Sequence, residues 1–199
     1  MDIIKLLYNW CGSLCLRKST DYIVMHHRAG NGDADSIHKQ HLSQGYSGIG
    51  YHYYVRKNGQ VFQGRPIDKV GAHCKGYNDK SVGVCFEGNF ENEKPTKEQL
   101  KAGNNLVKYI LNLYPQAKIV GHKDLMSTAC PGNNFNINEI LNYEVKSTFK
   151  ELISVNDIVW ELANRGILSD KNLWLQKLKD DENAYWLARK CVNYIRENE

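Results

Sequence analysis

Apolar runs of strand length alternate with helix-length patterns through the first 143 residues. The apolar stretch Tyr22-Ile23-Val24-Met25 predicts a buried strand that ends at His26. Asn58-Gly59 strongly favours a tight hairpin between two further strands. The strands predicted in this way cover residues 21–26, 51–56, 60–62, 82–86 and 118–120.

Segments with apolar residues at helical spacing lie between or beside these strands. Ile37, His41 and Leu42 predict a helix that is capped by Asp33 or Asp35 and stops before Gly45. A longer helix begins at Pro95-Thr96 and ends at Tyr114-Pro115. The first ten residues predict an amphipathic helix packed on the domain, with inward-facing apolar side chains at Ile3, Leu6, Leu7 and Trp10.

The order of these elements predicts an α/β fold with a central mixed β-sheet flanked by helices, over residues 1–143. Glycines become rare after residue 143, and helical patterns occupy residues 155–164, 170–179 and 183–196. Residues 144–199 therefore predict a small three-helix module. Its tryptophans either fill a small core or bind a surface; they are Trp160, Trp174 and Trp186.

Composition narrows the classes of protein to consider. The 199 residues are 42% apolar and 24% charged, as in an ordinary soluble globular protein. The net charge of +4 is small and its charges are interspersed, which argues against nucleic-acid binding but favours approach to anionic surfaces. No apolar stretch approaches the ~20 residues of a membrane span, so no membrane insertion is expected.

The cysteines and the chain start bear on where the protein is made. We expect most of the six cysteines to be reduced and buried, with a Cys11–Cys15 disulfide or metal site as the alternative. Asp2, Lys5 and Gly12 interrupt any secretory-signal pattern, so we expect synthesis in the cytoplasm.

Three residues form a candidate set of zinc ligands. His26 ends the first strand, His122 follows the strand at 118–120, and Cys130 lies in a loop that Pro131 and Gly132 keep from becoming helix. Zinc binds imidazole nitrogen and thiolate sulfur, and a catalytic zinc keeps a fourth position open for water. Ligands from two strand ends and a loop can converge on one ion.

Other histidines and acids are predicted to be structural. His27 points away from His26 if the strand continues. His38 and His41 lie one helical turn apart without an evident third ligand, and His52 neighbours Tyr51 on the opposite side of its strand. Glu87 follows a buried strand, and we expect it to form a salt bridge rather than to act as a helper base.

Several ordered motifs resemble those of the zinc-dependent N-acetylmuramoyl-L-alanine amidases of type 2. This family includes phage lysozyme-type amidases and peptidoglycan recognition proteins. The resemblance covers roughly residues 20–142. Its motifs are Ile23–Gly30, Gly48–Tyr53, Gly71–Asn78, Ser81–Val84, Gly121–Asp124 and Ala129–Gly132.

The resemblance implies zinc (Zn²⁺) as cofactor and hydrolysis of the amide between N-acetylmuramic acid and L-alanine of bacterial peptidoglycan. Tyr51 matches the tyrosine beside the zinc-bound water. Thr128 stands where phage members often have lysine and catalytic recognition proteins often have threonine. His73 and Asn78 match the border of the substrate groove, although a Gly-flanked His and Asn can equally fix a turn.

Three functions remain in view. The leading expectation is a phage or prophage endolysin that reaches the cell wall after holin-type release. A non-catalytic peptidoglycan-binding recognition module is the alternative, but such members lack the cysteine ligand, and Cys130 is present. A cysteine hydrolase would need a Cys130 thiolate without a metal. Residues 144–199 are a candidate wall-binding module, and the oligomeric state stays open.

Overall fold

The structure is a computed structural model that describes residues 2–143, 159, 162–164, 166–168 and 170–180. The chain divides into two compact units, residues 1–143 and 144–199. The first unit contains the sheet and all the residues singled out as candidate site residues. None of the described helices is long and apolar enough to span a membrane.

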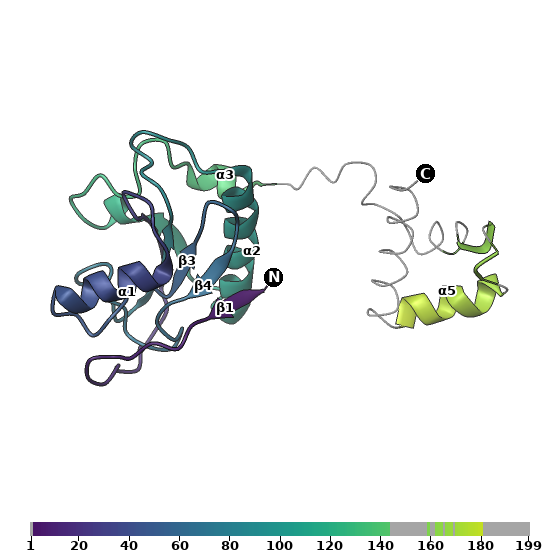
Figure 1. The fold of residues 1–199 in the computed structure, drawn as a ribbon, viewed down its shortest axis with the longest axis horizontal. Helices are drawn as coiled ribbons and strands as arrows, with labels where there is room; N and C mark the ends of the chain where they lie inside the picture. Colours follow the sequence, from purple (N-terminus) through teal and green to yellow (C-terminus); the bar gives the residue numbers. More distant parts are fainter. Residues whose placement is uncertain (1, 144–158, 160–161, 165, 169, 181–199) are drawn as a thin grey trace. The chain divides into compact units, whose positions relative to one another are not determined.

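A six-stranded sheet forms the centre of the first unit, with strand order β1-β4-β3-β5-β2-β6 (Figure 1). Of the described pairs, β3–β4 is antiparallel and the other four are parallel. The sheet is therefore mixed, as predicted. Its strands are β1 (Ile3–Lys5), β2 (Tyr22–His27), β3 (Tyr53–Val55), β4 (Val61–Gln63), β5 (Ser81–Phe86) and β6 (Lys118–Gly121).

Helices cover both faces of this sheet, with α1 (Ala34–Ser43) and α2 (Lys97–Leu113) on opposite sides of β3 and β4 (Figure 1). The large core lies on the α2 side, where Ile23 and Met25 of β2 pack with α2. A smaller core lies on the α1 side and includes Ile37 and Cys85. Because side chains alternate along a strand, His26 belongs to the α1 side.

The helix boundaries follow from their caps. Thr96 and Gln99 form a capping box at the start of α2, with the Thr96 side chain accepting from Gln99 N at 3.1 Å. Asp33 caps α1 by accepting from Ser36 N at 2.8 Å. Both helices were predicted with their starts within two residues of these positions. A short third helix, α3 (Ile137–Leu141), packs against α2.

The prediction of an amino-terminal helix is wrong. Ile3–Lys5 is strand β1, which pairs in parallel with β4, and Ile3 lies opposite Val61. Leu6 and Leu7 are exposed rather than packed inward. The edge of β4 offers unpaired backbone groups to this segment, and a distant strand edge leaves no trace in local helical spacing.

The cysteine prediction is partly confirmed. The five described cysteines are all free, and Cys74 and Cys85 are buried as expected. Cys11 and Cys15 are exposed instead, in the segment between β1 and β2. Cys191 lies outside the described residues.

The described part of the second unit contains α5 (Lys171–Asp180), which matches the helix predicted at 170–179. Asp170 Oδ1 accepts from Leu173 N at 3.0 Å and so caps it. Gly166 has φ +70° and follows the helical residues 162–164, as expected of a helix end. Trp160, Trp186 and the helix predicted at 183–196 lie outside the described residues.

Candidate metal centre and substrate cavity

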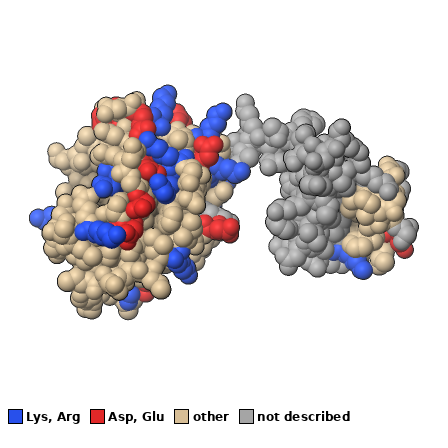
Figure 2. Space-filling view, in the orientation of Figure 1, with Lys and Arg blue, Asp and Glu red and all other residues tan. Residues whose placement is uncertain are grey.

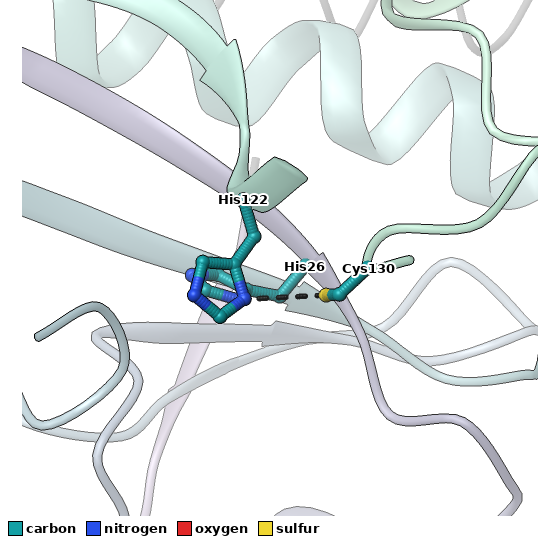
Figure 3. Close-up of side chains that lie close together, drawn as sticks. All are labelled: His26, His122 and Cys130. Atoms are coloured by element: carbon teal, nitrogen blue, oxygen red, sulfur yellow. Dashed lines mark hydrogen bonds between the residues drawn. The ribbon is translucent and has the colours of Figure 1, made fainter. Parts of the chain in front are cut away.

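Strand pairing brings His26 and His122 together. β2 lies between β5 and β6, and Met25 is in register with Gly121, the last residue of β6. The residue that follows each of these two is a histidine, His26 in β2 and His122 just after β6, and the centroids of the two rings are 4.5 Å apart. Figure 3 shows both side chains pointing to the same place from the ends of these strands.

A loop places the Cys130 side chain next to His26 and His122. Lys123 N donates to Cys130 O at 2.7 Å, which ties this loop to the short 3₁₀ helix η1 (His122–Asp124). Gly132 has φ +102°, and a Cβ there would lie 2.5 Å from the Phe90 carbonyl carbon, so the loop needs glycine to pack against the turn that follows β5. The Cys130 sulfur lies 3.7 Å from His26 Nδ1 (Figure 3).

The candidate ligand atoms of His26, His122 and Cys130 all lie within 4.8 Å of one another. Within the described residues this is the one group of three histidine, cysteine or acidic side chains with such spacing. Two imidazoles and a sulfur, with no carboxylate, suit a zinc ion better than magnesium or calcium. The donor set therefore fits the metal that the sequence predicts.

The protonation states suit metal ligands. Burial lowers the pKa of His26 well below its ordinary value, and it also lowers the pKa of His122, so both rings are neutral and offer lone pairs. Burial raises the pKa of the Cys130 thiol to about 11, against the opposing effect of a hydrogen bond from His27 N. A bound cation would favour the thiolate instead.

These pKa shifts argue against the cysteine-hydrolase alternative. A nucleophilic cysteine needs a lowered thiol pKa and a neighbouring histidine that accepts its proton. Burial shifts the Cys130 thiol in the opposite direction, and it also disfavours a protonated His26. Without a metal, the Cys130–His26 pair is therefore thiol and neutral imidazole.

A cavity of about 480 Å³ opens beside these residues. Four predicted site residues line it or reach it: Tyr51, His73, Asn78 and the ligand candidate His122. Its other lining residues were not predicted as site residues. Some lie within the Gly71–Asn78 motif, and the rest come from the end of α1 and from loops; they are His41, Gln44, Tyr46, Ala72, Cys74, Lys75 and Met126.

Tyr51 lies against the metal-ligand candidates, with its ring centroid 5.1 Å from that of His26. Burial raises the pKa of its phenol well above the ordinary value, and the nearby Cys85 and Cys130 sulfurs act in the same direction. Tyr51 therefore keeps its proton at neutral pH. Its chemical capacity is that of a hydrogen-bond donor rather than a base.

Thr128 is exposed and is not among the residues that line the cavity. Its Oγ1 accepts from Cys130 N at 3.2 Å, so the hydroxyl helps to shape the turn that carries the sulfur. A direct role of Thr128 in catalysis stays a prediction.

Asn78 and His73 have structural contacts in addition to lining the cavity. Asn78 Oδ1 accepts from the backbone amides of His73 and Cys74, both at 2.8 Å, which supports the turn-fixing alternative. His73 Nδ1 lies 3.0 Å from His26 Nε2, a contact that no motif in the sequence predicts. Contact of either residue with substrate stays a prediction.

The remaining histidines all make structural contacts, as predicted, and His41 also lines the cavity. In each case Nδ1 accepts a backbone amide, at 3.2, 3.1, 2.9 and 2.9 Å; the pairs are His27 with Phe90, His38 with Ile49, His41 with Gly50 and His52 with Gly83. The prediction for Glu87 is also confirmed, since it forms a salt bridge with Arg56 at 3.2 Å.

Charge around this unit is mixed. Figure 2 shows lysine and arginine side chains interspersed with acidic ones on the visible face. Ion pairs such as Lys57–Glu93 at 2.7 Å neutralise part of the basic charge locally. The visible face therefore lacks the continuous basic stripe that is typical of nucleic-acid binding.

Comparison with known proteins agrees with this site. A family model described as N-acetylmuramoyl-L-alanine amidase matches residues 16–133. The endolysin of Enterobacteria phage K11 is 36% identical over 124 residues, 58% of this chain and 82% of that protein. Peptidoglycan-recognition protein LB of Drosophila melanogaster is 36% identical over 103 residues, 50% of this chain and 44% of that protein.

A solved structure is also similar to this chain. The N-acetylmuramoyl-L-alanine amidase LysC from Clostridium intestinale URNW has a TM-score of 0.69 and 38% identity, covering 70% of this chain and 95% of that one. The chain therefore belongs to the N-acetylmuramoyl-L-alanine amidase family, and it is a peptidoglycan amidase.

Proposed function

We propose that this amidase is a zinc-dependent endolysin that cleaves the bond between N-acetylmuramic acid and L-alanine in bacterial peptidoglycan. The observation that carries the proposal is the convergence of His26, His122 and Cys130, whose ligand atoms lie within 4.8 Å of one another at the cavity. Three ligands leave a fourth tetrahedral position free, which is the arrangement of catalytic rather than structural zinc sites.

The residues of the site support a hydrolytic mechanism. Zinc bound there would supply a hydroxide at neutral pH and would polarise the scissile carbonyl. Tyr51, protonated because it is buried, would offer a hydrogen-bond donor to the substrate oxygen at the reacting carbon. Thr128 holds the turn that positions the sulfur and offers a neutral hydroxyl near it, in place of a lysine charge.

The cavity suits a glycopeptide segment, and Lys75 adds one positive charge to its lining. Tyr46 and Tyr51 contribute aromatic faces, and Gln44 and Asn78 contribute amides. Its volume of about 480 Å³ falls in the range of ordinary small-ligand sites. Recognition would then rest on shape and on a few polar groups.

A direct test combines metal analysis with product analysis. Purified full-length protein is expected to contain about one zinc per chain, to lose activity with a chelator and to regain it with added zinc. Mass analysis of digested peptidoglycan should find stem peptides with a free L-alanine amino terminus. Zinc-loaded protein that leaves the muramoyl amide intact would contradict the proposal.

Non-catalytic recognition of peptidoglycan is the second candidate function, and the similarity to a recognition protein favours it. Cys130 at the metal site weighs against it. The two functions are separated by the same digest, because a recognition module binds muropeptides but releases no peptide.

We also propose that residues 144–199 form a separate helical module that assists binding to the cell wall. Trp174 supports this idea, since it lies half-buried in α5 with Lys177 Nζ 5.2 Å from its ring centroid. A chain that ends at Tyr143 should bind isolated walls less tightly than the full chain in a pull-down. Equal binding of the two chains would exclude wall targeting by this module.

A further inference from the structure

His73 lies on the far side of the His26 ring from Cys130. His73 Nδ1 is 3.0 Å from His26 Nε2, whereas Cys130 Sγ is 3.7 Å from His26 Nδ1. The two nitrogens of the His26 ring therefore face different partners. Because a neutral imidazole has one N–H and one lone pair, the partner at Nε2 decides whether Nδ1 can bind a metal.

A chain of hydrogen bonds determines which nitrogen carries the proton on each ring. The Tyr77 carbonyl can only accept, and Ser81 Oγ donates to it at 2.6 Å. Ser81 Oγ then accepts from His73 Nε2 at 3.4 Å, the longest contact of the chain. His73 Nδ1 is left as an acceptor for His26 Nε2–H, which leaves the His26 lone pair on Nδ1.

Two glycines leave space for the His73 ring, and an asparagine fixes its backbone. A Cβ at Gly83 would lie 2.6 Å from the ring, and a Cβ at Gly71 would lie 2.5 Å from its Cδ2 atom. The ring thus occupies space that only glycine leaves free. Asn78 fixes the backbone of His73 through the 2.8 Å bond to its amide. His73 is therefore held in place before any ligand binds.

We propose that His73 is a positioning residue of the metal centre, which holds His26 in the Nε2–H tautomer with Nδ1 facing His122 and Cys130. The proposal rests on the zinc-dependent function proposed above. The outer partners of ligand histidines fix ring orientation, and their loss typically weakens metal binding about 10- to 100-fold. His73 thereby gains a role that its position in the cavity lining does not reveal.

Zinc affinity of full-length variants tests the proposal. His73→Leu removes the acceptor at similar size and should weaken zinc binding about 10- to 100-fold in competition with a chromogenic chelator. His73→Asn places an amide oxygen near the position of Nδ1 and should restore most of the affinity. Unchanged affinity in His73→Leu overturns the proposal, and so does equal weakening in both variants, which would indicate packing alone.

Two further measurements separate the possible causes. His38→Leu removes a buried imidazole that has no contact with His26, and it should leave zinc affinity unchanged. Long-range ¹H–¹⁵N spectra of the metal-free wild-type protein should show His26 as the Nε2–H tautomer, and an Nδ1–H form would overturn the proposal even if His73→Leu fails to fold. Absence of zinc binding by the wild type would instead refute the proposed function itself.

Discussion

Five of the seven histidines of this chain lie in two regions that use the same side chain differently. In the first, around α1 and residues 48–52, His38, His41 and His52 each accept a backbone amide at Nδ1. In the second, at the ends of β2 and β6, the rings of His26 and His122 face each other and a sulfur. Within the described residues, neither of these two accepts a backbone amide.

This difference separates a structural histidine from a candidate ligand. A nitrogen that accepts a buried amide cannot bind a metal without leaving that amide unpaired, which costs about 1–3 kcal/mol. His38 and His41 lie one helical turn apart, and two histidines at this spacing can chelate a metal ion. Their Nδ1 lone pairs nevertheless accept the backbone amides of Ile49 and Gly50, so this spacing does not create a metal site.

Substitutions in the second region should have the largest effect on zinc binding and activity. Cys130→Ser should abolish zinc binding and lower the rate of peptidoglycan clearing by about 10³-fold or more, because loss of the ion removes both carbonyl polarisation and the activated water. His26→Ala should behave in the same way. Turbidity assays with zinc analysis measure both effects, and urea unfolding checks that the fold remains.

Cys11→Ser is the matched control, since it makes the same chemical change at an exposed cysteine. It should retain zinc and activity. Full clearing activity in both Cys130→Ser and His26→Ala would refute the assignment of the second region as the reactive centre.

Tyr51→Phe should have the next largest effect. The substitution keeps the ring beside His26 and removes the phenolic donor, so we expect about a 10²-fold lower kcat with zinc content unchanged. Steady-state assays on a soluble muropeptide measure kcat and KM separately. A change confined to KM would make Tyr51 a binding residue instead.

His38→Leu should lower the free energy of unfolding by about 1–3 kcal/mol, because the buried amide of Ile49 loses its acceptor. Urea unfolding of the metal-free protein measures this loss. Activity per zinc-loaded molecule should stay at the wild-type level. If His38→Leu lost zinc as well as stability, the two regions would be coupled and would not act separately.

His52 makes the first region sensitive to acid. Burial, and then the nearby charge of Arg17, lower the pKa of His52 to about 3, although its backbone bond to Lys69 opposes them. Between pH 6.5 and about 3 the unfolded chain binds a proton at this position and the folded chain does not. Stability contributed by His52 is therefore lost as pH falls through this window, at about 1.4 kcal/mol per pH unit.

His52→Asn should reduce this slope, since its amide oxygen can still accept from Gly83 but does not titrate. The measurement is urea unfolding at several pH values between 4 and 6.5, with chelator present so that metal release does not contribute. An identical slope in the variant and the wild type would show that His52 protonates in the folded state as it does in the unfolded chain.

Local pattern predicted most elements because each depends on neighbours in sequence. The apolar run at 22–25, the Asn58-Gly59 turn and the Thr96 cap all act over a few residues, and each is present in the structure. β1 was missed because its stability comes from β4, about sixty positions away, and not from its own spacing.

The sequence by itself determined the family, the mixed sheet and the residues offered as metal ligands, because motifs and periodicity are properties of a continuous stretch of chain. Only the tertiary structure decided which histidine nitrogens remain free. That outcome depends on which amide or ring reaches each imidazole across the fold, as Phe90 reaches His27 and His73 reaches His26. A lone pair is engaged or left free by contacts between distant segments, and such contacts exist only once the chain has folded.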